Sequence, residues 1–226
     1  MALRRSLFRW HIWLAWVAGL PLLLWVLSGL VMVLRPIEEV RSTHLRAEPA
    51  PLRLAFPPVP PRLDARAVAA LNLAPRADGP VWQLRFADGT RRAASIIDGH
   101  ILPGINAALA LRIANGALKT PGQVTDVVHF AADAPPLELR QPRASWRVRY
   151  ADGLHVYVDA ATGEVLAVRS RLWRAYDFMW GIHILDPVGR EDTHHPLLML
   201  AAAVSLISVA IGIWLLLLRQ MRKRNV

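Results

Sequence analysis

Residues 10–34 read WHIWLAWVAGLPLLLWVLSGLVMVL and contain no Asp, Glu, Lys or Arg. Residues 196–218, PLLMLAAAVSLISVAIGIWLLLL, share this property. Each stretch is longer than the roughly 20 apolar residues that cross ~30 Å of hydrocarbon. Because a spanning segment must satisfy its backbone polar groups internally, each is predicted to be a helix. The sequence therefore predicts a membrane protein in which two transmembrane helices flank a water-exposed domain.

Charges outside the two stretches predict which side of the membrane each part occupies. Basic residues but no acids occur in residues 1–9 and 219–226, the two expected tails: Arg4, Arg5, Arg9, Arg219, Arg222, Lys223 and Arg224. Positive residues close to a span stay on the cytoplasmic side. We therefore expect both termini in the cytoplasm and the central domain in the periplasm, as in a protein of a bacterial inner membrane.

The net charge of +10 does not indicate nucleic-acid binding. Seven of the 27 basic residues lie in the tails, so 20 remain between the spans, where all 17 acids lie. Basic tails beside a span are typical of contact with anionic lipid, so membrane lipid is the expected partner and nucleic acid is not. The absence of cysteine excludes disulfides, thiolate metal sites and thioether attachment of haem.

The segment between the spans contains an internal repeat. VWQLRFADG, residues 81–89, aligns with SWRVRYADG, residues 145–153, at an offset of 64, which also relates Gly99 to Gly163. Alternation of apolar and polar residues is typical of a half-buried strand, and Asp-Gly suits a hairpin turn. We expect each copy to end in a three-stranded antiparallel meander. A helix is expected before each meander, over residues 64–73 with Asp64 as N-cap and over residues 106–118 with Asn106 as N-cap.

These elements predict an α+β domain composed of two repeats. Residues 35–61 form a Pro-rich linker, residues 62–104 the first repeat and residues 105–171 the second, with further strands expected at 124–130 and 137–139. Residues 172–195 are predicted to be an amphipathic segment on the outer membrane surface, helical over 172–185. Pro196 then occupies the first position of the second span.

His11 is the first candidate functional residue because ionisable groups within a span are costly. It lies in the first turn of the first span, next to Trp10 and Trp13. Two interpretations remain open at this position. The imidazole either has a functional role or is an anchor in the belt of aromatic residues at the membrane surface.

A second group of candidates lies where the second span begins. His183 shares a helix face with Trp180, and His194 and His195 precede Pro196. These imidazoles could bind haem, could bind a divalent metal together with neighbouring acids (Asp186, Glu191 and Asp192), or could belong to a capping network. The other histidines are expected to be structural or solvated: His44, His100, His129 and His155.

Geometry limits how these histidines could share one iron. His11 and His195 are expected at opposite faces of the membrane, about 30 Å apart, and cannot bind the same haem. A site with two imidazoles would pair His183 with His194 or His195, or would use the same histidine from two subunits. A homodimer or another membrane or periplasmic redox protein is therefore the expected partner.

The motifs resemble a known family. WRVRYADG followed by VYVDAATGEVL, residues 146–166, is similar to the PepSY domain, and residues 82–102 form a weaker copy. The flanks are similar to PepSY-associated transmembrane helices: FRWHIW at residues 8–13, Ser28-Gly29, YDFMWGIHILD at residues 176–186, and HHPLL at residues 194–198. Relatives of this kind include inner-membrane reductases of iron–siderophore uptake that bind b-type haem, and regulators without known chemistry.

The resemblance implies two functions. The first is a subunit of a membrane redox system, possibly in iron acquisition, in which b-type haem is bound by His11, His183, His195 or His194. The second is a non-catalytic membrane module whose periplasmic repeats bind, tether or regulate a partner protein. The chain has no phosphate-binding loop, nucleophile elbow or zinc-protease motif. It is therefore not expected to be an enzyme alone, although it could be a subunit of an oxidoreductase.

Overall fold

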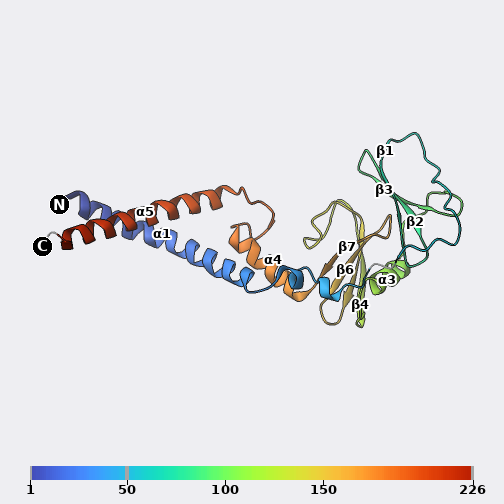
Figure 1. Cartoon of the computed structure of the whole chain (residues 1–226), viewed down its shortest axis with the longest axis horizontal. Helices are drawn as coiled ribbons and strands as arrows, with labels where there is room; N and C mark the ends of the chain where they lie inside the picture. The colour runs from blue at the N-terminus through green and yellow to red at the C-terminus, as the bar shows by residue number, and fades with distance from the viewer. Residues whose placement is uncertain (1, 49–50, 225–226) are drawn as a thin grey trace. The chain divides into compact units, whose positions relative to one another are not determined.

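The computed structural model describes residues 2–48 and 51–224 of the chain (Figure 1). Two compact units are present: Met1–Pro36 together with Ala175–Val226, and Ile37–Arg174. We call the first the membrane unit and the second the soluble unit. The linker residues Pro49 and Ala50 and the outermost tail residues Met1, Asn225 and Val226 lie outside the described residues.

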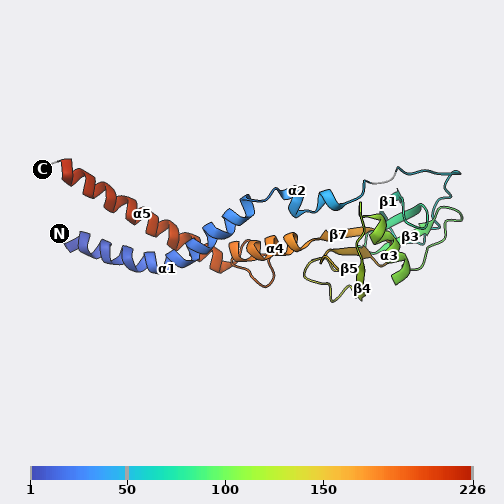
Figure 2. The same ribbon diagram turned by 90° about the horizontal axis from the view of Figure 1, so that it is seen from below.

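Two long apolar helices dominate the membrane unit. Helix α1 covers Ala2–Val33 and helix α5 covers Pro196–Arg224, and the two are in contact and cross one another (Figures 1 and 2). Each contains a stretch, Phe8–Val33 and Pro196–Met221, that is long and apolar enough to cross a membrane. Both helices continue beyond the predicted spans into the basic tails, since Arg, Lys and Leu are good helix formers.

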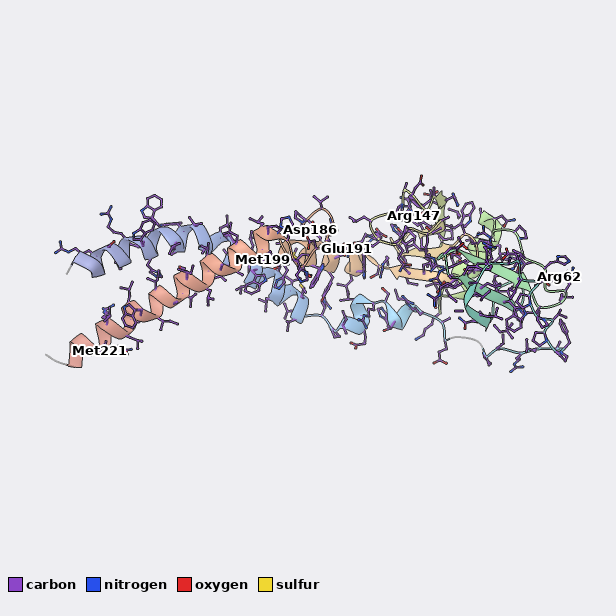
Figure 3. All side chains as sticks on the ribbon, turned by 90° about the horizontal axis from the view of Figure 1, so that it is seen from above. Arg62, Arg147, Asp186, Glu191, Met199 and Met221 are labelled. Carbon is purple, nitrogen blue, oxygen red and sulfur yellow. The ribbon has the colours of Figure 1, made fainter. Side chains whose placement is uncertain are left out.

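Helix α4 (Arg171–His183) matches the amphipathic helix predicted in front of the second span. A loop connects it to α5, and Figure 3 shows Asp186 and Glu191 in this loop, with Met199 and Met221 towards the two ends of α5. The Asp186 carboxylate accepts hydrogen bonds from three backbone N–H groups of the loop: those of Gly189, Glu191 and Asp192. The Asp186 side chain thus holds the backbone of the loop in its folded conformation.

Two antiparallel sheets form most of the soluble unit. The first has the order β1-β2-β3, with β1 at Val68–Ala74, β2 at Val81–Phe86 and β3 at Arg91–Ser95. The second has the order β4-β5-β6-β7, with β4 at Val124–Phe130, β5 at Ser145–Tyr150, β6 at His155–Asp159 and β7 at Val165–Arg169. Short helical turns, α2 (Ile37–Val40) and η1 (Thr43–Leu45), precede the sheets.

The offset of 64 residues found in the sequence is also present in the strands. Strands β2 and β5 start and end 64 residues apart and have the same sequence of buried and exposed positions, as Arg85 and Arg149 both point outward. Their register is equivalent too: Trp82 pairs with Ala94 and Trp146 pairs with Val158. Both indoles are half-buried, and each donates its N–H to a backbone carbonyl. The two sheets are therefore copies of one arrangement.

Helix α3 (Ala107–Gly116) packs on the second sheet and forms its core. Asn106 is the N-cap, as predicted, and its side chain accepts a hydrogen bond from the backbone N–H of Leu109. Apolar residues of α3 and the sheet form one buried cluster: Ile105, Ala110, Ile113, Ala114, Leu118, Val148, Tyr150, Leu154, Val156, Val158 and Val168. Tyr150 also donates its hydroxyl to Asn115, over 2.8 Å.

Three local predictions were wrong. Residues 64–73 do not form a helix: Asp64 closes a turn by accepting the N–H of Arg66, and β1 follows because pairing with β2 outweighs helix propensity. Residues 137–139 are a turn in which the N–H of Leu139 bonds to the carbonyl of Pro136. The third strand of the first repeat is reduced to a single bridge between Ala94 and Ile101.

Candidate functional site

His183, the last residue of α4, is held against α1 within the membrane unit. Its Nδ1 lies 3.1 Å from the Oγ of Ser28 and 3.1 Å from the backbone carbonyl oxygen of Trp25. The imidazole also stacks on the Trp25 indole, with ring centroids 5.4 Å apart. Because a carbonyl oxygen can only accept, the proton of the neutral ring is assigned to Nδ1. Nε2 therefore keeps its lone pair and is the nitrogen available to a ligand.

Gly29 makes this close approach of α4 to α1 possible. A Cβ atom at position 29 would lie 3.2 Å from Cε1 of His183 and 3.6 Å from its Nδ1. The side chain before it, Ser28, is 2% exposed and donates its hydroxyl to the Trp25 carbonyl oxygen over 3.0 Å. A small residue and a hydroxyl in an otherwise apolar helix thus create the surface on which the imidazole rests.

His183 also lines a cavity between the two long helices. The cavity has a volume of about 340 Å³, at the lower end of the size of small-molecule sites. Apart from His183 and Ser205, its wall is apolar: Pro21, Leu22, Trp25, Leu185, Leu198, Ala201, Ala202, Leu206 and Val209. One imidazole in an otherwise apolar wall suits a ligand that is itself mostly apolar.

His11 has a comparable contact with α5. A Cβ atom at Gly212 would lie 3.0 Å from Cε1 and 3.4 Å from Nε2 of His11, so the imidazole packs directly on the α5 backbone. Its Nδ1 is buried and has no hydrogen-bond partner among the described residues. A buried polar atom without a partner costs free energy, which makes His11 a functional candidate on physical grounds.

His194 and His195 lie in the loop at the start of α5 and make local contacts. The Nδ1 of His195 is 3.3 Å from the backbone N of Leu197, where it accepts a hydrogen bond in the first turn of the helix. The backbone N–H of His194 donates to Asp192, and its ring lies beside the Thr193 hydroxyl. The capping network that the sequence left open is therefore the arrangement observed at these two residues.

Two acids near these imidazoles, Asp186 in the α4–α5 loop and Asp177 in α4, have other partners. Asp186 bonds to backbone N–H groups, and Asp177 forms an ion pair of 2.9 Å with Arg190. The N–H of the Trp180 indole donates to the carbonyl oxygen of Arg190. Among the described residues, no three His, Asp or Glu side chains converge on one point as a metal site would require.

The soluble unit contains an ionic cluster that the sequence did not reveal. Glu138 accepts hydrogen bonds at one oxygen from Nδ1 of His155, over 2.8 Å, and from the Tyr157 hydroxyl, over 3.0 Å. Arg174 lies 3.6 Å from its other oxygen. Burial raises the pKa of Glu138, but the hydrogen bonds and the positive charges around it prevail and lower it. Seventeen residues separate Glu138 from His155, so no local motif could signal the pair.

Comparison with known proteins establishes the family. The model of the PepSY-associated TM region matches residues 8–225, nearly the whole chain. The chain belongs to this family. No curated protein and no solved structure matches it. A PepSY-associated membrane protein with two terminal apolar helices and a central α+β region is thus established, which confirms the fold class and the resemblance.

The family is described by its transmembrane region, and both imidazole contacts lie in the membrane unit. His11 and His183 both lie in the membrane unit, and each packs on a glycine of the opposite helix, Gly212 and Gly29. Ser28-Gly29 was noted in the sequence as part of the resemblance, whereas Gly212 was not. The signal that could have found Gly212 is a glycine inside an apolar span, where the absence of a side chain permits close packing.

Proposed function

We propose that this PepSY-associated protein is a subunit of a redox system in the bacterial inner membrane and that His183 would hold the iron of b-type haem. The observation that supports the proposal is the His183 imidazole itself, which is fixed at Nδ1 by Ser28 and Trp25 and lines an apolar cavity. In most metal-binding histidines, one ring nitrogen binds the metal and the other donates its N–H to a backbone carbonyl, a carboxylate or water. A bound haem would supply one-electron chemistry at its iron.

The residues present supply one imidazole that could hold haem in this cavity. His183 supplies the lone pair of Nε2, and the walls contributed by α1 and α5 suit the apolar edge of a porphyrin. His194 and His195 make local contacts at the start of α5, so we expect a second ligand to come from a second copy of the chain or from another membrane or periplasmic redox protein. His11, with its unpaired Nδ1, is the candidate for a separate site at the other end of the helix pair.

The proposed orientation places both termini in the cytoplasm and the soluble unit in the periplasm. It rests on the basic tails and on the positive-inside rule. The soluble unit would then face a periplasmic electron acceptor. A role in iron acquisition rests only on the family resemblance.

The test is the absorbance of the full chain, purified in detergent after expression with added haem precursor. We expect a Soret band, and we expect His183→Ala to lower it strongly, because the imidazole that lines the cavity is lost. His100→Ala is the matched control, since His100 is an exposed residue that follows a turn. A correctly folded and colourless wild-type protein would contradict the proposal.

The alternative is a non-catalytic module that binds a partner through the soluble unit. Strand β1 is an edge strand of the first sheet, and Leu71 on it is 40% exposed. Ile97 is 71% exposed and Ile101 is 40% exposed on the same repeat. Exposed edges and apolar residues are features of protein-binding surfaces. Colourless wild-type protein that co-purifies with one periplasmic partner would favour this function.

A further inference from the structure

A groove at the beginning of α1 combines positive charge with aromatic surface. It has a volume of about 700 Å³ and is lined by Arg5, Ser6, Arg9, Trp10 and Trp13. The helix explains its shape, because residues spaced by four form parallel ridges along a helix surface. Arg5, Arg9 and Trp13 form one ridge, and Ser6 and Trp10 form part of the neighbouring ridge.

The two guanidinium groups in this groove are not neutralised by the protein. Among the described residues neither Arg5 nor Arg9 forms an ion pair or a hydrogen bond to a carboxylate, and both side chains are exposed. The sequence contains no Asp or Glu before Glu38 and none after Asp192. No Asp or Glu near the start of α1 or the end of α5 in sequence therefore competes for these guanidinium groups.

The position of the groove sets the depth at which a ligand would lie. Arg9 directly precedes the uncharged stretch that starts at Trp10, so its guanidinium group is expected at the level of the lipid headgroups. Trp10 is 64% exposed and Trp13 is 70% exposed. Indoles at this level favour the boundary between headgroup and acyl chain, whereas paired guanidinium groups favour phosphate oxygens.

We propose that this groove binds the phosphate headgroup of an anionic phospholipid. Arg5 and Arg9 hold the phosphate, the Ser6 hydroxyl donates a further hydrogen bond, and the two indoles pack on the glycerol and the upper acyl chain. This inference goes beyond the proposed redox function and does not depend on haem. It assigns the basic beginning of α1 to a specific lipid site, which differs from diffuse attraction to a charged surface.

Native mass spectrometry of the full chain, released from detergent with added lipid, tests the proposal. We expect the wild type to retain phosphatidylglycerol in preference to phosphatidylcholine. The double variant Arg5→Gln/Arg9→Gln should bind phosphatidylglycerol roughly 30-fold more weakly, from two cationic contacts. The double variant Arg5→Lys/Arg9→Lys should recover only part of the affinity, because lysine keeps the charge but not the bidentate geometry.

Arg219→Gln/Arg222→Gln is the charge-matched control, since it removes two basic residues near the end of α5. We expect this variant to bind phosphatidylglycerol as the wild type does. Equal weakening in both Gln variants would overturn the specific site in favour of diffuse charge, as would unchanged binding in Arg5→Gln/Arg9→Gln. Displacement of phosphatidylglycerol by low millimolar inorganic phosphate would instead identify a site for a free anion and overturn the assignment to lipid.

Discussion

The Nδ1 atom of His183 lies 3.1 Å from the Oγ of Ser28, although 155 residues separate the two in the chain. This contact joins the end of α4 to α1 within the membrane unit. It positions the imidazole beside the cavity between α1 and α5 and leaves Nε2 available.

Gly29→Val should displace the His183 imidazole, because a Cβ at this position already lies 3.2 Å from Cε1 and the methyl groups need more room. We expect a lower melting temperature and, if haem is bound, a weaker Soret band. Gly19→Val is the matched control in the same helix, since a Cβ at Gly19 meets nothing within 4 Å. Equal losses in the two variants would show that helix propensity, and not the contact with His183, is responsible.

Gly212→Val tests the corresponding contact of His11. A Cβ at Gly212 would lie 3.0 Å from Cε1 of His11, so valine should separate α1 from α5 or force the imidazole to rotate. We expect a destabilised helix pair, measured as a lower melting temperature in detergent. His11→Ala should restore much of the loss by removing the obstacle. If the double variant is no more stable than Gly212→Val alone, the clash with His11 is not the cause.

Asp159→Asn should destabilise the soluble unit. The carboxylate is buried and accepts hydrogen bonds from two backbone N–H groups, from the Thr162 hydroxyl and from Arg143. Loss of one partner of a buried charge pair costs about 3 kcal/mol in the free energy of unfolding. Chemical denaturation of the full chain measures this, with exposed Asp133→Asn as control. A change below about 0.5 kcal/mol would contradict the structural role of the pair.

Glu138 should make the stability of the soluble unit depend on pH. Its pKa is lowered in the folded protein from an ordinary value of 4.5, so its contribution is fully present above that value. The contribution is lost as the pH falls below 4.5 through the lower folded pKa. We expect Glu138→Gln to reduce the loss of melting temperature on acidification from pH 6 to pH 3.5, whereas exposed Glu48→Gln should not. Identical pH profiles for Glu138→Gln and the wild type would remove Glu138 as the cause.

Membrane orientation is tested by fusions to alkaline phosphatase, which is active only in the periplasm. We expect activity for a fusion after Pro136 in the soluble unit and none for a fusion after Val226, because the basic tails stay in the cytoplasm. The opposite pattern of activities would reverse the orientation and place the soluble unit inside the cell.

The spans, the α+β class and the repeat could be predicted because their signals are local or periodic. An uncharged run long enough to cross a membrane admits only a helix, and the alternation around Trp82 and Trp146 admits only a strand with one buried face. Residues 64–73 were mispredicted as a helix. Pairing of β1 with β2 decides their conformation, and helix propensity, a property of the local sequence, does not take that pairing into account. Glycine at 89 and 153, each with φ of 84°, marks turns that the Asp-Gly motif had predicted.

Only the tertiary structure decided which candidate residues meet. The sequence offered four candidate histidines: His11, His183, His194 and His195. Packing brings His183 to Ser28 and Trp25 and His11 to Gly212, while His194 and His195 make local contacts at the start of α5. The pair of Glu138 and His155 was likewise invisible before folding. The physical reason is that contacts between residues far apart in the chain depend on how helices and strands pack. That packing results from all interactions of the fold together and leaves no local signal in the sequence.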